Sequence, residues 1–325
     1  MEKLAHNHIG KGLQTRRRSK LIISALVCTL IVLILALGLG LGLGLRHQSS
    51  EQVPTARAIP TPTGKWEPEV GLSWQIVLND GLQIDNNAPA IQPDVDVYDI
   101  DMFTHQNTSV VEHLHSLGKR VICYFSAGSY EPYRPDSYLF HQRDLGNTLD
   151  GWEDEYWLDI RSQSIHDIMA SRIKVAYEMG CDGIDPDNID GYHNENGLRL
   201  TKQDAINFVS FLAKEADRYN LATGLKNGAD MIEDVLPLIQ FSVNEQCAEY
   251  EECQVFAAFI DSGKPVFHIE YPAEMPNRLP QGDRAAAACS APGTEGFSTV
   301  LKTMELTGWV EYCNGHTAKT SVLST

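Results

Sequence analysis

Short apolar segments alternate with helical stretches along most of this 325-residue chain. Gly118, Gly180 and Gly263 each follow a helical stretch and precede an apolar segment, as helix C-cap glycines do. Eight such strand–helix units over about 250 residues predict an α/β fold, a (β/α)8 TIM barrel. A doubly wound sheet is the alternative, but a glycine-rich phosphate loop does not follow any of the segments. The predicted strands are Trp74–Leu78, Val95–Phe103, Val121–Ala127, Gly183–Asp187, Ala222–Leu225, Phe241–Glu245, Val266–Tyr271 and Ser298–Leu301. The predicted helices are Val110–Leu117, Ile165–Met179, Lys202–Tyr219, Met231–Leu238 and Glu251–Asp261.

Polar residues stand at the ends of seven of these strands. In a barrel of this type the carboxyl ends of the strands form the active site. The sequence therefore predicts a polar cleft lined by carboxylates at that end. The residues concerned are Asn79 and Asp80, Asp99 and Asp101, Ser126 with Gly128 and Ser129, Asp185 with Asp187 and Asn188, Lys226 and Asn227, Asn244 and Glu245, and Glu270 and Tyr271.

An uncharged run of 25 residues, 21–45, precedes the barrel. It is longer than the ~30 Å hydrocarbon core of a bilayer requires and too long for the apolar part of a signal peptide. Basic residues crowd its N-terminal side at 16–18 and 20. The positive-inside rule then predicts a single-pass type II membrane protein with a cytosolic tail at 1–20, a transmembrane helix at 21–45, a proline-rich stalk at 46–70 and a catalytic domain at 71–325. This domain would be extracellular or luminal, and Asn107, in Asn-Thr-Ser, would be its glycosylation site.

The part of the chain after the uncharged run is strongly acidic. Residues 47–325 hold 19 of the 26 basic residues and 42 of the 43 acidic ones, a formal net charge of −23. This charge argues against nucleic acid and against an anionic membrane surface as partners. A solvated surface and a cationic ligand both remain compatible with it.

Six cysteines lie outside the uncharged run, and six cysteines allow 15 pairings. Cys247 and Cys253 are close enough to join one loop by a disulfide, and Cys289 with Cys313 could fix the C-terminal part. Cys123 and Cys181 sit at strand positions, where they could remain thiols. The cysteine and histidine spacing does not match a zinc site, and we expect neither metal nor cofactor.

Most glycoside hydrolases use a pair of carboxyl groups, and two carboxylates on nearby strands can form such a pair. The fourth and sixth predicted strands would lie about 10 Å apart, so inward side chains would bring Asp187 and Glu245 within roughly 5–9.5 Å. That range covers both retaining and inverting enzymes. Asp185 is expected to be a buried structural partner, and Lys226 to tune a carboxylate rather than form a Schiff base. Asp182 and Asp190 could equally cap a helix or pair with a basic residue.

Long motifs in the same order resemble those of glycoside hydrolase family 114, the endo-α-1,4-polygalactosaminidases. The motifs are "WQIVLND", "VYDIDMF", "VICYFSAGSYEPYRPDS", "GWEDEYWLDIRS", "GCDGIDPDNIDGY", "GLKNG", "FSVNEQCAEYEEC" and "VFHIEY", and they cover about residues 72–273. The resemblance implies a (β/α)8 fold. It also implies that Asp187 of "DPDN" and Glu245 of "NEQC" are the catalytic pair. Asp187 would be the nucleophile, because Lys226 could keep it ionised, and Glu245 the general acid.

The resemblance also implies a cationic substrate, because galactosamine that has lost its acetyl group carries an ammonium. The expected function is endo-hydrolysis of α-1,4-linked galactosamine in a partly deacetylated galactosaminogalactan by a monomeric enzyme. The strand-end residues, the residues implied by the resemblance, and aromatic rings suited to stacking on sugars make up the predicted substrate-binding set. It consists of Asp80, Asp101, Tyr124, Ser126, Asp159, Asp185, Asn188, Lys226, Asn227, Glu270 and Tyr271.

Two other classes of protein are compatible with parts of the sequence. A cytosolic tail, an anchor and a stalk also build type II membrane glycosyltransferases, which hold a metal and a nucleotide sugar through an Asp-x-Asp motif. Such motifs occur at 94–96, 99–101 and 185–187. The barrel pattern argues against this class. A carbohydrate-binding barrel without catalytic activity would keep the cleft and release no product.

Overall fold

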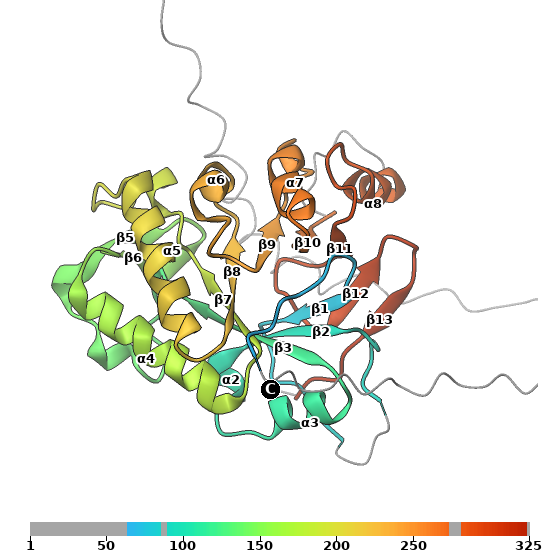
Figure 1. Ribbon diagram of the computed structural model, residues 1–325, viewed down its shortest axis with the longest axis horizontal. Coiled ribbons are helices and arrows are strands. Elements are labelled where there is room, and N and C mark those ends of the chain that lie inside the picture. Colours follow the sequence, from blue (N-terminus) through green and yellow to red (C-terminus); the bar gives the residue numbers. More distant parts are fainter. Residues whose placement is uncertain (1–63, 86–89, 273–280, 324–325) are drawn as a thin grey trace, which may run out of the picture. The chain divides into compact units, whose positions relative to one another are not determined.

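Ten strands form one sheet, and eight of them run parallel in the order β1-β2-β3-β7-β8-β9-β10-β11 before two antiparallel strands complete it. The structure is a computed structural model that describes residues 64–85, 90–272 and 281–323 (Figure 1). The parallel strands are β1 (Trp74–Val77), β2 (Val97–Asp101), β3 (Arg120–Ser126), β7 (Gly183–Asp187), β8 (Ala222–Lys226), β9 (Phe241–Glu245), β10 (Val266–Glu270) and β11 (Ser298–Leu301). The antiparallel strands are β12 (Trp309–Tyr312) and β13 (Thr317–Lys319).

The sheet curls so that β1 meets the segment from β11 to β12. The Trp74 indole donates to the Ser298 carbonyl at 2.6 Å, and the Leu78 amide donates to the Leu306 carbonyl at 3.0 Å. The buried ammonium of Lys302 donates to Gln75 Oε1, to the Ile76 carbonyl and to the Thr307 carbonyl at 3.0, 2.7 and 2.7 Å. The result is a barrel-like α/β fold, as the strand–helix alternation predicts.

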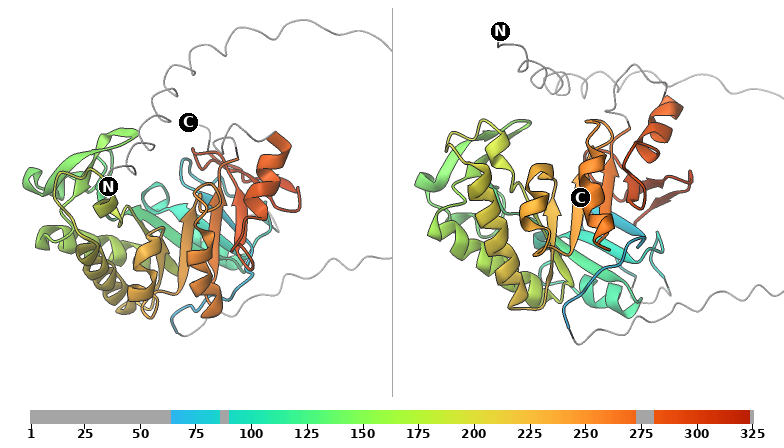
Figure 2. Two further views of the ribbon diagram at one scale, coloured as in Figure 1. Left: turned by 90° about the horizontal axis from the view of Figure 1, so that it is seen from above. Right: turned by 45° about the horizontal axis from the view of Figure 1, so that its top comes forward.

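Helices cover the outside of the curled sheet (Figures 1 and 2). Helix α5 begins with a capping box in which Thr201 accepts from the Asp204 amide, and α4 ends at Gly180, whose φ of 87° suits glycine. The helices are α2 (Met102–His105), α3 (Val110–Ser116), α4 (Gln163–Met179), α5 (Lys202–Asp217), α6 (Ile232–Val235), α7 (Cys253–Asp261) and α8 (Gln281–Cys289). Short 3-10 helices lie at Ser137–Leu139, Gln142–Asp144, Gly191–His193 and Ala229–Met231.

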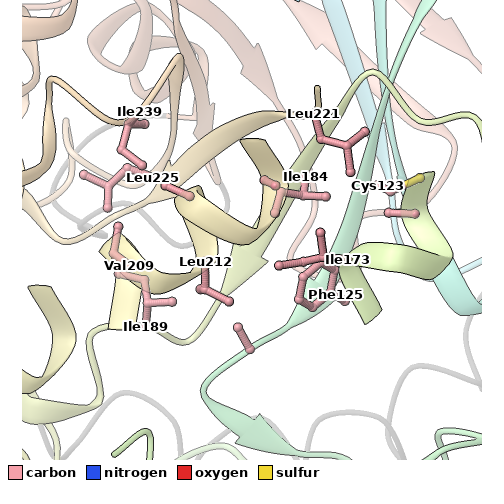
Figure 3. Packing of buried hydrophobic residues seen from close by; sticks show 14 of the residues in the cluster. Cys123, Phe125, Ile173, Ile184, Ile189, Val209, Leu212, Leu221, Leu225 and Ile239 are labelled. Carbon is pink, nitrogen blue, oxygen red and sulfur yellow. The ribbon is translucent and has the colours of Figure 1, made fainter. Parts of the chain in front are cut away.

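Alternation along the strands separates two layers of buried side chains. Outward residues such as Phe125, Ile184 and Leu225 pack against α4 and α5, and Figure 3 shows part of this layer. Inward residues form a second cluster with an aromatic floor, in which Phe241 lies 5.6 Å from Phe267 and 6.0 Å from the Trp66 ring, between ring centroids. The inward positions nearer the carboxyl ends of the strands are polar, and these build the site described below.

A three-stranded antiparallel sheet, which the sequence pattern did not predict, is inserted between β3 and α4. Its strands are β4 (Ser129–Tyr130), β5 (Leu145–Leu149) and β6 (Trp152–Leu158), in the order β4-β6-β5. Figure 2 shows the β5–β6 hairpin on the opposite side of the sheet from β12 and β13.

Three disulfides link the six cysteines of the described residues. Cys247 is bonded to Cys253 and Cys289 to Cys313, the pairs that their spacing suggested. The sequence left open whether Cys123 and Cys181 remain thiols, and these two residues form the third disulfide. Cys123 lies opposite Ile184 in the β3–β7 ladder, and Cys181 lies two residues before β7, so the strand pairing brings the two sulfurs together.

The described helices include none that is long and apolar enough to cross a membrane. The predicted tail, transmembrane helix and most of the predicted stalk lie at 1–63, outside the described residues.

Lys302 provides a test of how the curled sheet is held together. Replacement by alanine removes the three hydrogen bonds that Lys302 donates to β1 and to the Thr307 carbonyl, so we expect the free energy of unfolding to fall by about 2–4 kcal/mol. Lys319 on β13 is exposed, and its replacement by alanine should cost less than about 0.5 kcal/mol. Urea unfolding of both variants measures the difference, and equal losses would contradict this role of Lys302.

Candidate active site

One buried lysine lies among three carboxylates at the carboxyl ends of β7, β8 and β9. Lys226 ends β8, and its Nζ is 3.2 Å from Asp187 Oδ2, 3.4 Å from Glu245 Oε2 and 3.6 Å from Asp185 Oδ2. Because β8 pairs with β7 and β9, inward residues at the ends of these strands must meet. The lysine side chain is 2% exposed, whereas Asp187 and Glu245 keep 18% and 21% of theirs exposed. A ligand that approaches from solvent could therefore contact the two carboxylates but not the buried ammonium group of Lys226.

Asp187 is oriented by three donors. Its Oδ2 accepts from the Tyr124 hydroxyl at 3.1 Å and from Lys226, and its Oδ1 accepts from the Asn188 amide at 2.7 Å. Asn188 adopts a positive φ of 60° and donates from its side chain to Ser126 Oγ at 2.9 Å. Donors at both oxygens fix the direction of the carboxylate.

Glu245 is held from two sides. The Tyr271 hydroxyl donates to Oε1, and the Glu245 amide donates to Asn227 Oδ1 at 2.8 Å. Asn227 adopts a positive φ of 48°, a conformation that asparagine tolerates better than most residues. The predicted residues Tyr124, Ser126, Asp185, Asn188, Lys226, Asn227 and Tyr271 thus all contribute to one site around the predicted pair.

The charges of the site depend on one another. Burial alone would lower the pKa of Lys226, but the carboxylates of Asp185, Asp187 and Glu245 raise it well above its usual range. Burial raises the pKa of Asp185 to about 7, against the opposing effect of Lys226. Burial and the proximity of Asp185 also raise the pKa of Asp99, a fully buried residue of β2 that the sequence placed at a strand end. Lys226 therefore stays charged. Asp185, whose pKa is about 7, is protonated in part of the molecules at neutral pH.

The distance between the two candidate catalytic carboxylates is bounded by their shared partner. Since Asp187 Oδ2 and Glu245 Oε2 lie 3.2 and 3.4 Å from the same Nζ, they cannot be more than about 6.6 Å apart. Retaining glycosidases separate their carboxyl groups by about 5–5.5 Å and inverting ones by about 6.5–9.5 Å. The bound on these two oxygens is compatible with the retaining separation and lies near the lower end of the inverting range.

The inserted sheet supplies a further wall of charged residues that the sequence pattern did not predict. Arg134 pairs with Asp101 Oδ2 at 2.6 Å and with Glu131 Oε1 at 2.7 Å. The predicted residue Asp101 is itself buried and caps α2 through the Thr104 amide at 2.7 Å. Glu155 of β6 accepts from Ser129 Oγ at 3.0 Å. The only sequence signal for this wall was the long gap between the third predicted strand and the helix that follows.

Three residues of the predicted substrate-binding set lie elsewhere. Glu270 is fully buried at the end of β10, directly before Tyr271, and accepts from the Ala248 amide at 2.7 Å, so its side chain does not join the cluster around Lys226. Asp159 pairs with Arg161 at 2.7 Å and does not contact the cluster around Lys226. Asp80 is partly exposed after β1, and its side chain is not part of that cluster either.

Asp182 has the structural role that the sequence left open. It accepts from Arg120 at 2.5 Å, from His115 Nε2 at 2.8 Å and from the Val121 amide at 2.8 Å. These contacts lie before β7 begins, at the opposite end of the strand from Asp187.

Four side chains behind β9 and β10 resemble a metal site in composition. Ligand atoms of Cys247, Cys253, His268 and Glu270 all lie within 4.8 Å of one another, and all four residues are buried. The two sulfurs are joined to each other, however, so only the histidine and the glutamate remain as ligands. This is fewer than the three protein ligands of catalytic zinc sites.

The chain is similar to known glycoside hydrolases. The model of glycoside-hydrolase family GH114 matches residues 55–318. The crystal structure of Aspergillus fumigatus Ega3 in complex with galactosamine is 48% identical, with a TM-score of 0.70, and the match covers 78% of this chain and 99% of that one. The glycoside hydrolase domain of PelA from Pseudomonas aeruginosa, 15% identical with a TM-score of 0.57, shares the fold over 77% of this chain and 99% of its own. A search of curated protein sequences found no match.

The charge balance predicts a pH dependence of stability. The raised pKa of Asp185, about 7 against an ordinary 3.8, means that the folded state holds this proton more tightly than the unfolded state. The contribution of this carboxyl group to stability therefore declines as the pH rises from about 4 to about 7. Asp185→Asn removes the titration, so the difference in free energy of unfolding between about pH 4.5 and about pH 7 should shrink by about 2–3 kcal/mol.

Urea unfolding at the two pH values measures this difference. Asp167→Asn, at an exposed position of α4, is the matched control and should leave the difference unchanged. An unchanged difference in Asp185→Asn as well would show that Asp185 titrates normally in the folded protein.

Proposed function

The chain belongs to glycoside-hydrolase family GH114, and we propose that it is an endo-acting hydrolase of α-1,4-linked galactosamine in a cationic polysaccharide. The observation that carries the proposal is the pair Asp187 and Glu245, partly exposed at the ends of β7 and β9 and held by one buried lysine of β8. The similar Ega3 structure contains galactosamine, which supports an amino sugar as the substrate. The substrate class is a galactosaminogalactan that has lost part of its acetyl groups.

Asp187 is proposed as the nucleophile. Its three donors hold and aim the carboxylate, and the separation of the pair is compatible with a retaining reaction. In this reaction a carboxylate oxygen of Asp187 bonds to the anomeric carbon while the glycosidic bond breaks. Glu245 donates its proton to the leaving oxygen, then takes a proton from the water that releases the sugar from Asp187. The Tyr271 hydroxyl and Lys226 keep Glu245 in place through both steps.

Charge supports the same substrate class. An unacetylated galactosamine polymer is a polycation, and residues 47–325 carry a formal net charge of −23. Electrostatic attraction of this kind raises the encounter rate within a Debye length of about 8 Å at physiological salt.

The membrane arrangement is a separate part of the proposal. Residues 1–20 would form a cytosolic tail, 21–45 a transmembrane helix and 46–70 a stalk, with a complete (β/α)8 catalytic barrel at 71–325 outside the cytosol. The uncharged run and the basic residues before it support this order. Asn107 is exposed between α2 and α3, where an oligosaccharide could be attached.

Substitution of either carboxylate should abolish most of the activity without unfolding the protein. Asp187→Asn and Glu245→Gln keep the shape of the side chain and remove its charge or its proton. We expect each to reduce turnover of partly deacetylated galactosaminogalactan by at least about 10²-fold, measured from the oligosaccharides released. Asp167→Asn on the surface of α4 should retain the wild-type rate.

The same assay separates the two roles. Azide should restore activity to Asp187→Ala by replacing the missing nucleophile, and the wild-type enzyme should release products that first appear in the α configuration. Rescue confined to the Glu245→Ala variant would exchange the two roles. Wild-type turnover in Asp187→Asn or Glu245→Gln would end the assignment of the pair.

The membrane arrangement can be tested on intact microsomes. If residues 21–45 span the bilayer with the basic side in the cytosol, added protease should spare the catalytic domain and digest it only after detergent treatment. Asn107→Gln should increase the mobility of the protein on a gel by removing one oligosaccharide. A catalytic domain that is digested in intact vesicles would contradict the proposed orientation.

A further inference from the structure

Tyr133 is an exposed aromatic residue whose hydroxyl is anchored on buried charges. The side chain follows β4 and is 63% exposed. Its hydroxyl oxygen lies 3.0 Å from Glu131 Oε1 and 2.9 Å from Glu155 Oε1, so its one proton is shared between two glutamates that are only 3% and 7% exposed. Burial and the two carboxylates raise the pKa of Tyr133, so its hydroxyl remains a donor. The exposed ring is therefore fixed at its polar end.

One face of the same ring is also held. The Arg134 guanidinium carbon lies 5.2 Å from the centroid of the Tyr133 ring and 5.0 Å from that of Phe103. Arg134 is in turn fixed by its ion pairs with Glu131 and Asp101. With its hydroxyl and one face engaged, the ring cannot turn freely, yet most of its surface faces solvent.

Hydrogen bonds connect this ring to the catalytic pair. Glu155 accepts from Ser129 Oγ, which lies 2.6 Å from Ser126 Oγ. The Asn188 side chain donates to Ser126, and the Asn188 amide donates to Asp187. Tyr133 is therefore linked to the candidate nucleophile through a chain of hydrogen-bonded side chains.

Tyr138, five residues further along the chain, shows the contrast. It is 81% exposed on the short helix at Ser137–Leu139, without an anchor of the kind that holds Tyr133. Single exposed aromatic side chains are common on protein surfaces. A ring that two buried carboxylates hold in one orientation is different, because it is already arranged to bind a ligand.

We propose that Tyr133 is the stacking platform of a sugar subsite beside the catalytic pair and binds a second amino sugar of the same polymer. The apolar face of a pyranose ring packs on an aromatic ring, and an ammonium group is attracted both by the ring and by the two carboxylates beneath it. Glu131 pairs with Arg134 through Oε1, and its buried Oε2 is without a hydrogen-bond partner among the described residues. The inference rests on the proposed function, because it assigns a binding role within the same cleft.

The dependence of the Michaelis constant on substrate length tests the proposal. The full-length protein would be assayed on unacetylated α-1,4-galactosamine oligomers, some too short to reach beyond the catalytic pair and some long enough to do so. Tyr133→Ala should raise KM for the long oligomers about five- to tenfold, with kcat and the constants for short oligomers near wild type. Tyr133→Phe keeps the ring without its anchor and should show a smaller increase.

Tyr138→Ala is the matched control and should behave as wild type on every oligomer. Calorimetric binding of the long oligomer to Asp187→Asn, with and without Tyr133→Ala, measures the same loss without turnover. An unchanged KM and affinity in Tyr133→Ala, or an equal loss of kcat on short and long oligomers, would overturn the platform. Wild-type protein that cleaves none of the oligomers would overturn the proposed function itself.

Discussion

The carboxylates that gather inside the curled sheet depend on the ammonium group of Lys226 as their shared partner. A carboxylate taken out of water without a partner costs several kcal/mol or becomes neutral. Here three carboxylates on β7 and β9 converge on one cation that is itself almost fully buried. The strand between them makes room for this arrangement: a Cβ on Gly224 of β8 would lie 2.5 Å from the Phe241 ring. The polar layer can therefore rest directly on the aromatic floor.

Much of this architecture could be predicted from the sequence, because parallel strands leave a strong pattern. Buried strands are short and apolar, their ends are polar, and the helices between them end at glycines. The predicted bounds of β7, β9 and β11 agree with the structure to the residue. Neighbouring strand ends then identify Asp187, Lys226 and Glu245 as a group, since only chain order and parallel pairing are needed to bring them together.

Two features of the site are not specified by the sequence pattern: the direction of individual side chains and the contacts between distant segments. Glu270 and Tyr271 are adjacent on one extended segment, so only one of them can face the cleft, and the polar character of both concealed this. The wall formed by Arg134, Glu131 and Glu155 depends on an antiparallel sheet inserted into the pattern. Its contact with Asp101 joins segments that sequence spacing alone does not relate.

The disulfide between Cys123 and Cys181 joins β3 covalently to the segment just before β7, the strand that ends in Asp187. In the β3–β7 ladder Cys123 lies opposite Ile184, and Ser126 lies opposite Asp187. A slip of one residue would turn every side chain of one strand to the other face. A covalent bond between residues 58 apart in the chain keeps β3 and the start of β7 together, including in states in which β8 and β9 are not docked. The bond thus narrows the positions that the strand of the candidate nucleophile can take relative to β3.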